Sequence, residues 1–180
     1  MTAKLQMIGN AALLDRPDKV AFLSSRRISA ADVLKCYEWA EKIRDTDRCV
    51  ISGFQSPLEK DVLKFLLRGK VSVILVLARS LWKTIPEELR ASVNLGRLLI
   101  VSPVSATRAS AATAAVRNRW ILAHCTSLVL GSLDPSGNLA KLVALFPAAN
   151  MKCLQQDLHR NPARRSTGTG EEGVGESPAP

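Results

Sequence analysis

Five short apolar runs, separated by segments with helical spacing, constrain the fold of this chain more than any other feature. The runs cover residues 20–23, 49–51, 71–77, 98–101 and 128–130. Apart from Ser72, the residues within each run are all apolar, which is typical of strands covered on both faces. Strands of this kind that alternate with helices predict an α/β fold with a mostly parallel sheet and helices on both faces. The longest run, residues 71–77, is expected at the centre of the sheet.

The segments between the runs carry the start and stop signals of helices. Ser29 is a suitable N-cap for a helix over residues 30–44, where apolar residues recur at helical spacing. Proline is tolerated in the first turn of a helix, so Pro57 favours a second helix over residues 57–67. Further helices are expected at residues 85–94, around residues 117–124 and, helical or mixed, around residues 139–145.

The composition divides the 180 residues into three parts. Residues 1–19 are expected to form an N-terminal lead-in packed on the core, and residues 20–158 to form the single α/β domain. The last part, residues 159–180, is rich in arginine, glycine and glutamate, which predicts a disordered tail. Its three arginines and three glutamates cancel, so the formal net charge of +9 is assigned to the other two parts.

The charge favours an anionic partner, most simply nucleic acid. There are 25 Lys and Arg against 16 Asp and Glu, whereas aromatic residues make up only 4% and argue against a long path of stacked rings. Four distant cysteines and two histidines give no support for a metal site or cofactor, so the cysteines are interpreted as buried free thiols. With no signal peptide and no run long enough to span a bilayer, a cytoplasmic protein without membrane contact is expected.

Small and hydroxyl residues follow the predicted strands. Ligands of such sheets bind outside the carboxyl ends of the strands, near the point where the strand order reverses. Backbone amides and hydroxyl groups at these ends suit a phosphate group, although loops that bind no ligand have a similar composition. The residues at these ends are Ser24, Ser25 and Arg26, then Ser52 and Gly53, then Ser102, and finally Gly131 and Ser132.

Arg117-Asn118-Arg119 lies at what is predicted to be the front of a helix. The planar fork of arginine suits phosphate, and asparagine adds an amide that can donate or accept. A solvated helix face with ordinary charges is the alternative interpretation. His124 follows Arg117 by about two helical turns, and a helix-terminal or core histidine is favoured over a catalytic one.

No motif in the chain predicts catalysis. The nucleophile elbow and the Walker loop are absent from the sequence, and none of the five predicted strands is followed by the dinucleotide-binding glycine motif. Glu59, Asp61 and Asp134 lie near loop ends, but their spacing pairs none of them as acid and base. A protein that binds, and is not an enzyme, is therefore the prediction.

The order of the motifs resembles that of the DNA-processing protein A (Smf) family, over about residues 8–145. Residues 8–14 are similar to its Gly-Asn and Leu-Leu lead, and residues 20–26 to its strand that ends in Gly-Ser-Arg. Residues 50–53 resemble its Val-Ser-Gly strand end, and residues 117–123 its Arg-Asn-Arg-Ile-Ile-Ala signature. Ser136-Gly137 lies where the family has Ser-Gly after the fifth strand.

The resemblance implies a Rossmann-like three-layer sandwich that binds single-stranded DNA in DNA recombination and natural transformation. It also implies a homodimer and, as a further partner, a RecA-type recombinase. Phosphate contacts would make binding depend on salt and little on base sequence. The residues carried over as DNA- or phosphate-binding are Ser24, Ser25, Arg26, Ser52, Gly53, Arg117, Asn118, Arg119, Ser136 and Gly137.

Several positions depart from the family pattern. The first glycine of its Gly-Ser-Arg is Ser24 here, and Ser56-Pro57-Leu58-Glu59 stands where Gly-Ile-Asp is usual. Ala114-Ala115 replaces the Phe-Pro ahead of the arginine triplet, and no winged-helix module is recognised. These departures predict a reduced, divergent relative and bear more on recombination-mediator activity than on the fold.

Two alternatives to DNA binding remain open at this point: a protein that acts on or senses a nucleotide-derived ligand, and a domain without such a ligand. Phosphoribohydrolases of related fold carry a Pro-Gly-Gly-x-Gly-Thr run and a glutamate, which residues 131–137 lack. A non-catalytic sensor of a nucleotide-derived ligand would use the same phosphate groove. An interaction or structural domain with a solvated basic surface is the third interpretation.

Overall fold

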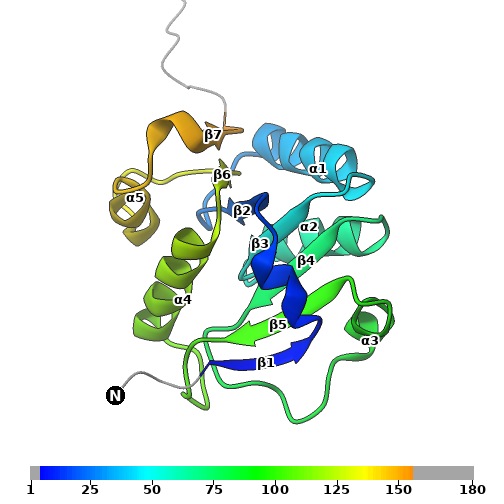
Figure 1. Ribbon diagram of the computed structural model, residues 1–180. Coiled ribbons are helices and arrows are strands. Elements are labelled where there is room, and N and C mark those ends of the chain that lie inside the picture. Colours follow the sequence, from blue (N-terminus) through cyan, green and yellow to red (C-terminus); the bar gives the residue numbers. More distant parts are fainter. Residues whose placement is uncertain (1–4, 156–180) are drawn as a thin grey trace, which may run out of the picture.

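A seven-stranded sheet forms the middle layer of the protein (Figure 1). In this computed structural model, which describes residues 5–155, the strands lie in the order β1-β5-β4-β3-β2-β6-β7. All neighbours are parallel except β1, which runs antiparallel to β5. The strands are β1 (Gln6–Gly9), β2 (Lys19–Leu23), β3 (Cys49–Ser52), β4 (Ser72–Val76), β5 (Leu98–Ser102), β6 (Ser127–Leu130) and β7 (Met151–Cys153).

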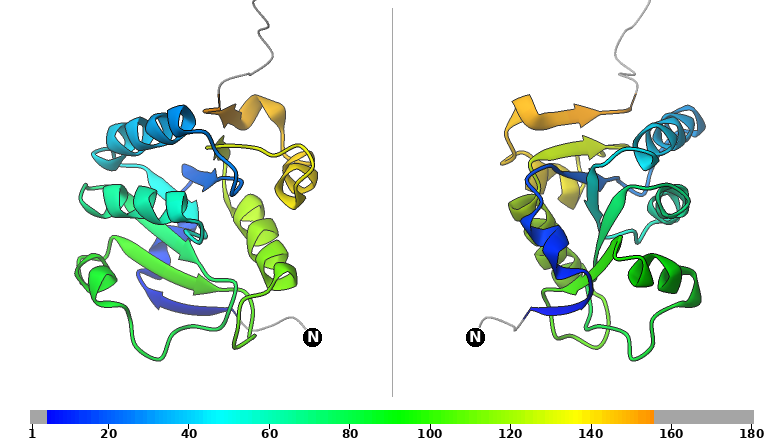
Figure 2. Two further views of the ribbon diagram at one scale, coloured as in Figure 1. Left: turned by 180° about the vertical axis from the view of Figure 1, so that it is seen from behind. Right: turned by 45° about the vertical axis from the view of Figure 1, so that its right-hand side comes forward.

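Helices cover both faces of the sheet, which Figure 2 shows nearly edge-on in its right-hand view. One face carries α1 (Ala30–Arg44), α2 (Pro57–Leu67) and α3 (Glu87–Asn94). The other carries the 3-10 helix η1 (Ala11–Asp15), α4 (Ala111–His124) and α5 (Asn138–Val143), and a short 3-10 turn, η2 (Ala148–Asn150), precedes β7. The predicted α/β, Rossmann-like sandwich is therefore confirmed.

The core consists of two apolar clusters, one on each face of the sheet. Val20 and Phe22 of β2 belong to the cluster under α1, α2 and α3. Ala21 and Leu23 belong to the cluster under η1, α4 and α5. Successive strand residues point to opposite faces, so a strand buried on both faces needs an unbroken apolar run. Trp39 of α1 stacks on Phe22 with ring centroids 4.9 Å apart.

Two helices have the predicted bounds because side chains fix their first turns. The Ser29 hydroxyl accepts a hydrogen bond from the Asp32 amide at 3.1 Å, and α1 covers the expected residues 30–44. Ser56 and Glu59 form a capping box at the start of α2. α4 differs, because its cap is Ser110 and it begins at Ala111. The triplet at residues 117–119 therefore lies in the middle of this helix, and the prediction that it lies at the front was wrong.

The centre of the sheet is β3, and the prediction of a central position for residues 71–77 was wrong. If the five predicted strands followed one another in space, the strand at residues 71–77 would lie in the middle. Instead β6 pairs with β2 on the far side of the sheet from β5. This reversal places β3 at the centre and creates the switch point between β2 and β6.

The N-terminal segment contributes an edge strand. β1 pairs with β5, and the Asn10 side chain donates to the Gly96 carbonyl at 2.8 Å. Gly9 has a φ of +106°, and a Cβ there would lie 2.2 Å from the carbonyl oxygen of Leu98, so only glycine fits this position. The predicted boundary at residue 19 stays a prediction. The predicted tail, residues 159–180, lies outside the described residues.

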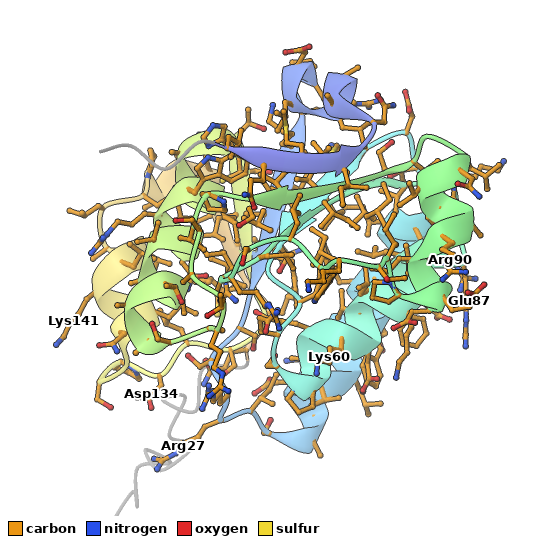
Figure 3. All side chains as sticks on the ribbon, turned by 90° about the horizontal axis from the view of Figure 1, so that it is seen from below. Arg27, Lys60, Glu87, Arg90, Asp134 and Lys141 are labelled. Atoms are coloured by element: carbon orange, nitrogen blue, oxygen red, sulfur yellow. The ribbon has the colours of Figure 1, made fainter. Side chains whose placement is uncertain are left out.

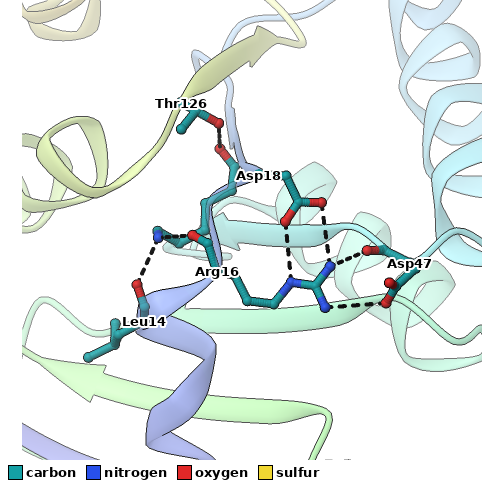
Figure 4. A network of polar contacts seen from close by, with 6 residues as sticks. Leu14, Arg16, Asp18, Asp47 and Thr126 are labelled. Atoms are coloured by element: carbon teal, nitrogen blue, oxygen red, sulfur yellow. Dashed lines mark hydrogen bonds and ion pairs between the residues drawn. The ribbon is translucent and has the colours of Figure 1, made fainter.

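A polar network ties the amino ends of the strands together (Figure 4). Arg16 pairs with Asp18 and with Asp47, each at 3.2 Å. The ammonium of Lys19, which is buried, donates to the carbonyls of Leu14 and Arg16. Thr126 donates to the Lys19 carbonyl at 3.1 Å. These contacts connect η1 with β2 and with the residues just before β3 and β6.

The four cysteines are free thiols, but not all of them are buried. Cys36 and Cys49 are buried, and burial raises the pKa of each thiol to about 12. Cys153 is exposed because β7 is an edge strand, and this differs from the expectation of buried thiols. Within residues 5–155 no three or more His, Cys, Asp and Glu side chains are grouped in a way that could hold a metal ion. No helix in this part of the chain has the length and apolar character needed to cross a membrane.

Candidate functional site

A polar hollow lies at the carboxyl ends of the parallel strands, between the start of α2 and the first half of α4. Its volume is about 400 Å³. We call it the polar groove. The polar and charged side chains that line it are Ser24, Arg26, Gln55, Ser56, Glu59, Ser110, Arg117 and Asn118. Its position matches the expectation for a ligand site in this fold class.

Arg117 forms the buried floor of the polar groove. Its side chain comes from the inner face of α4, and only 7% of the residue is exposed. Nε and Nη2 both donate to Oδ1 of Asn118, at 3.0 and 2.9 Å, and Nη1 has no acceptor among the described residues. Burial lowers the pKa of this guanidinium, and the nearby charge of Glu59 opposes that shift. The group is therefore a fixed, partly desolvated cation with a donor left for a ligand.

Gly53 makes room for this guanidinium. A Cβ on Gly53 would lie 2.6 Å from both Cζ and Nε of Arg117. The turn is tight, since the next residue, Phe54, has a φ of +46°. Ser52 is fully buried, and its hydroxyl accepts from the Phe54 amide at 3.4 Å. The Ser52-Gly53 turn thus supports Arg117 from below and does not line the polar groove.

Replacing Gly53 by alanine is expected to move the Arg117 guanidinium and to weaken binding of an anionic ligand by about fivefold, because charge-assisted hydrogen bonds depend on geometry. Arginine is flexible enough to shift, so the fold should survive. Gly137→Ala is the matched control, because Gly137 lies outside the groove. The affinity of each variant for a fluorescent oligonucleotide is measured in a binding titration. Equal effects of the two substitutions would show that Gly53 has no special role.

Glu59 lines the polar groove, and sequence reasoning did not include it among the candidate site residues. Glu59 is 5% exposed, and its carboxylate accepts the amide hydrogens of Gln55 at 2.9 Å and Ser56 at 3.0 Å. Its other oxygen faces the Ser24 amide at 3.3 Å, at the end of β2. The signal available in the sequence was the capping box of Ser56 and Glu59. The bond to Ser24, 35 residues away in the chain, could not be predicted from it.

The start of α4 forms the opposite wall. The Ser110 hydroxyl accepts from the Thr113 amide at 3.2 Å, and small residues such as Ala111 and Ala114 line the groove. The amides of Ala111 and Ala112 have no acceptor within residues 5–155. Amides at a helix start carry partial positive charge and attract anions. Together with Arg26 and Arg117, this wall can hold a phosphate group.

The loops beside the switch point are joined to each other. The Ser25 amide donates to the Ser132 carbonyl at 2.9 Å, and the Ser25 hydroxyl accepts from the Asp134 amide at 2.9 Å. Ser132 in turn donates to the carbonyl of Arg27 at 2.7 Å. Figure 3 shows Asp134 and Arg27, one on each loop, at the same side of the molecule. These bonds join the loops after β2 and β6, and the polar groove lies beside them, with Ser24 after β2 and Gln55 after β3 in its lining.

The structure brings four of the ten predicted site residues together in the polar groove: Ser24, Arg26, Arg117 and Asn118. Ser52 and Gly53 lie beneath them, and Ser25 bonds the neighbouring loop. Ser136 and Gly137 belong to a turn in which Asp134 accepts the Ser136 hydroxyl at 2.7 Å and the Gly137 amide at 2.9 Å. Neither of these two residues lines the groove.

Arg119 lies on a different side of α4 from Arg117. Successive helix residues are about 100° apart, so two positions turn the side chain about 200° away. Arg119 is exposed and lines a mostly apolar hollow with Leu122 and Phe146. His124 is the last residue of α4; its Nδ1 lies 2.7 Å from the Trp120 carbonyl and its ring stacks on Trp120 at 3.8 Å. This is the helix-terminal histidine that was expected.

Comparison with known proteins agrees with the motif order. Residues 2–144 match the family model described as DNA recombination-mediator protein A. Two solved structures of DNA processing protein A have the same fold. The protein from Helicobacter pylori, described for its single-stranded DNA binding mode, has a TM-score of 0.68 and 20% identity, with 88% of this chain and 74% of that one covered. The protein from Streptococcus pneumoniae has a TM-score of 0.56 and 19% identity, with 70% and 45% covered. No curated protein matched the sequence.

Proposed function

The chain belongs to the DNA recombination-mediator protein A family, and from that premise we propose that it binds single-stranded DNA in DNA processing and recombination. The polar groove would hold the phosphate backbone. The observation that carries this proposal is the buried Arg117, fixed by Asn118 over Gly53 at the carboxyl ends of the parallel strands. A fixed cation with a free donor suits an anion better than a mobile surface lysine does.

Each part of the groove has its role in the proposed complex. Arg117 and Arg26 neutralise a phosphate, while the open amides at the start of α4 donate to its oxygens. Asn118 holds Arg117 in place and keeps its own amide nitrogen for a ligand. Phosphate contacts position a strand without reading its bases, so weak sequence preference is expected.

Within the proposed function the protein acts by binding and not by catalysis. It works in the cytoplasm as a homodimer and delivers DNA to a RecA-type recombinase. Support for a single-stranded DNA ligand comes from the family that the chain belongs to and from the similar Helicobacter pylori protein, which is described by its single-stranded DNA binding mode. The basic charge of +9 is consistent with a nucleic-acid partner.

A salt titration tests the proposed function. The protein should bind a fluorescent oligo-dT strand at low salt, and the logarithm of the binding constant should fall linearly with the logarithm of the salt concentration, by about 0.7 per phosphate contacted. Fluorescence anisotropy at several salt concentrations gives this slope. No binding at low salt would refute the proposal. Tight binding of a mononucleotide without strand binding would support a nucleotide sensor instead.

A further inference from the structure

A side-chain carboxylate of the protein itself, that of Glu59, occupies the start of α2. The amides of Gln55 and Ser56, which could otherwise hold a phosphate, both donate to the carboxylate of Glu59. The amide of Ser24 at the end of β2 faces the same carboxylate. Helix starts are natural phosphate sites, so Glu59 takes the place that a second phosphate would have in the polar groove.

This resident anion sets the charge of the groove. The charged side chains in its lining are Arg26, Arg117 and Glu59, a formal net charge of +1. Glu59 also lies close enough to Arg117 for its charge to act on the pKa of the guanidinium. A lining of +1 is neutralised by a single negative charge. A ligand with two negative charges leaves one of them uncompensated beside a buried carboxylate.

We infer that Glu59 makes the polar groove select phosphodiesters, the links within a nucleic-acid strand, over phosphate monoesters such as free nucleotides and 5′-phosphate ends. The inference rests on the proposed function and specifies its ligand. A phosphodiester carries one negative charge. A phosphate monoester carries between about 1.5 and 2 at neutral pH, because its second pKa lies near 6. The repulsion from Glu59 therefore falls more heavily on the monoester.

Geometry makes the repulsion effective. Glu59 is 5% exposed, so water screens its charge less than that of a surface carboxylate. The carboxylate is held by three backbone amides from two different elements, and it cannot swing away when a ligand enters. A fixed repulsive group of this kind is a known route to discrimination between ligands that share the same attractive contacts.

The test compares two small competitors of a fluorescent oligo-dT strand. One is thymidylyl-thymidine, whose only phosphate is a diester, and the other is thymidine 5′-monophosphate. With the unmodified protein the diester should compete better. In Glu59→Gln, which keeps the length and an acceptor oxygen, the monoester should gain about tenfold more affinity than the diester, as expected for removal of one charge near a partly buried site.

Two further variants separate charge from structure. Glu59→Asp keeps the charge and should keep the preference for the diester. Glu87→Gln on α3, outside the polar groove and labelled in Figure 3, changes the net charge equally and should leave the ratio of the two affinities unchanged. Thermal unfolding shows whether each variant is folded. If Glu59→Gln is folded and both ligands gain equally, or neither gains, the inference is wrong.

Failure of the inference and failure of the proposed function give different results. If the unmodified protein does not bind oligo-dT at low salt, the proposed function fails before any competitor is added. If oligo-dT binds and the ratio of the competitors does not depend on Glu59, only the selection of phosphodiesters fails.

Discussion

Replacing Arg117 by alanine should weaken binding of single-stranded DNA by about 10- to 100-fold, since a charge-assisted hydrogen bond contributes about 1.5–3 kcal/mol. The large effect follows from burial: Arg117 is 7% exposed, and the place of its guanidinium on Gly53 and Asn118 is fixed before a ligand arrives. Anisotropy titrations with oligo-dT at one low salt concentration measure the loss. Circular dichroism and thermal unfolding verify that the variant is folded.

Arg119→Ala is the matched control for Arg117→Ala. Both substitutions remove one arginine from α4, but Arg119 is exposed and lies outside the polar groove. Its loss should reduce affinity by less than about threefold, through the overall charge alone. Arg117→Lys should recover only part of the affinity, because lysine lacks the fork that Asn118 holds. Equal losses for Arg117→Ala and Arg119→Ala would remove the groove from the proposed function.

The triplet shows what a local motif can and cannot predict. Arg117 and Asn118, which the sequence predicts as phosphate-binding, both line the polar groove. The prediction also grouped Arg119 with Arg117 and Asn118, because the three residues are adjacent in one sequence motif. On a helix, the side chains of three successive residues point in directions about 100° apart. The buried residues of α4 decide which of these side chains faces the sheet.

The fold was predictable where burial is continuous and caps are local. The interior strands β2 and β5 are fully buried and apolar except for one residue at an end, and the hydroxyls of Ser29 and Ser56 mark the first turns of α1 and α2. The edge strands β1 and β7 were missed, because short strands with exposed residues have no apolar run to reveal them. The hydrogen bonds of Ser25 with Ser132 and Asp134 join residues 107 and 109 positions apart in the chain. No local sequence pattern predicts such contacts.

Ile121→Ala should have the largest effect on stability among the substitutions considered. Arg117 and Ile121 are the two buried residues of α4, one turn apart on the same face. Ile121 is fully buried in the cluster that includes Leu99 and Leu128. Truncation to alanine leaves a cavity and should lower the free energy of unfolding by about 3 kcal/mol. The unfolding midpoint should fall by about 6 to 12 °C in a chain of this size.

The same substitution tests whether the packing of α4 supports the site. Ile121 fixes the helix against the sheet, so its loss should let the helix move and should weaken DNA binding less than Arg117→Ala does, even at a temperature where the protein is fully folded. Ile121→Val removes one methylene and should cost about 1 kcal/mol. Urea unfolding with unchanged m-values gives the free energies. If alanine and valine have equal effects on stability, or if Ile121→Ala costs less than about 1 kcal/mol, Ile121 does not anchor α4, and the fixed position of Arg117 must come from Asn118 and Gly53 alone.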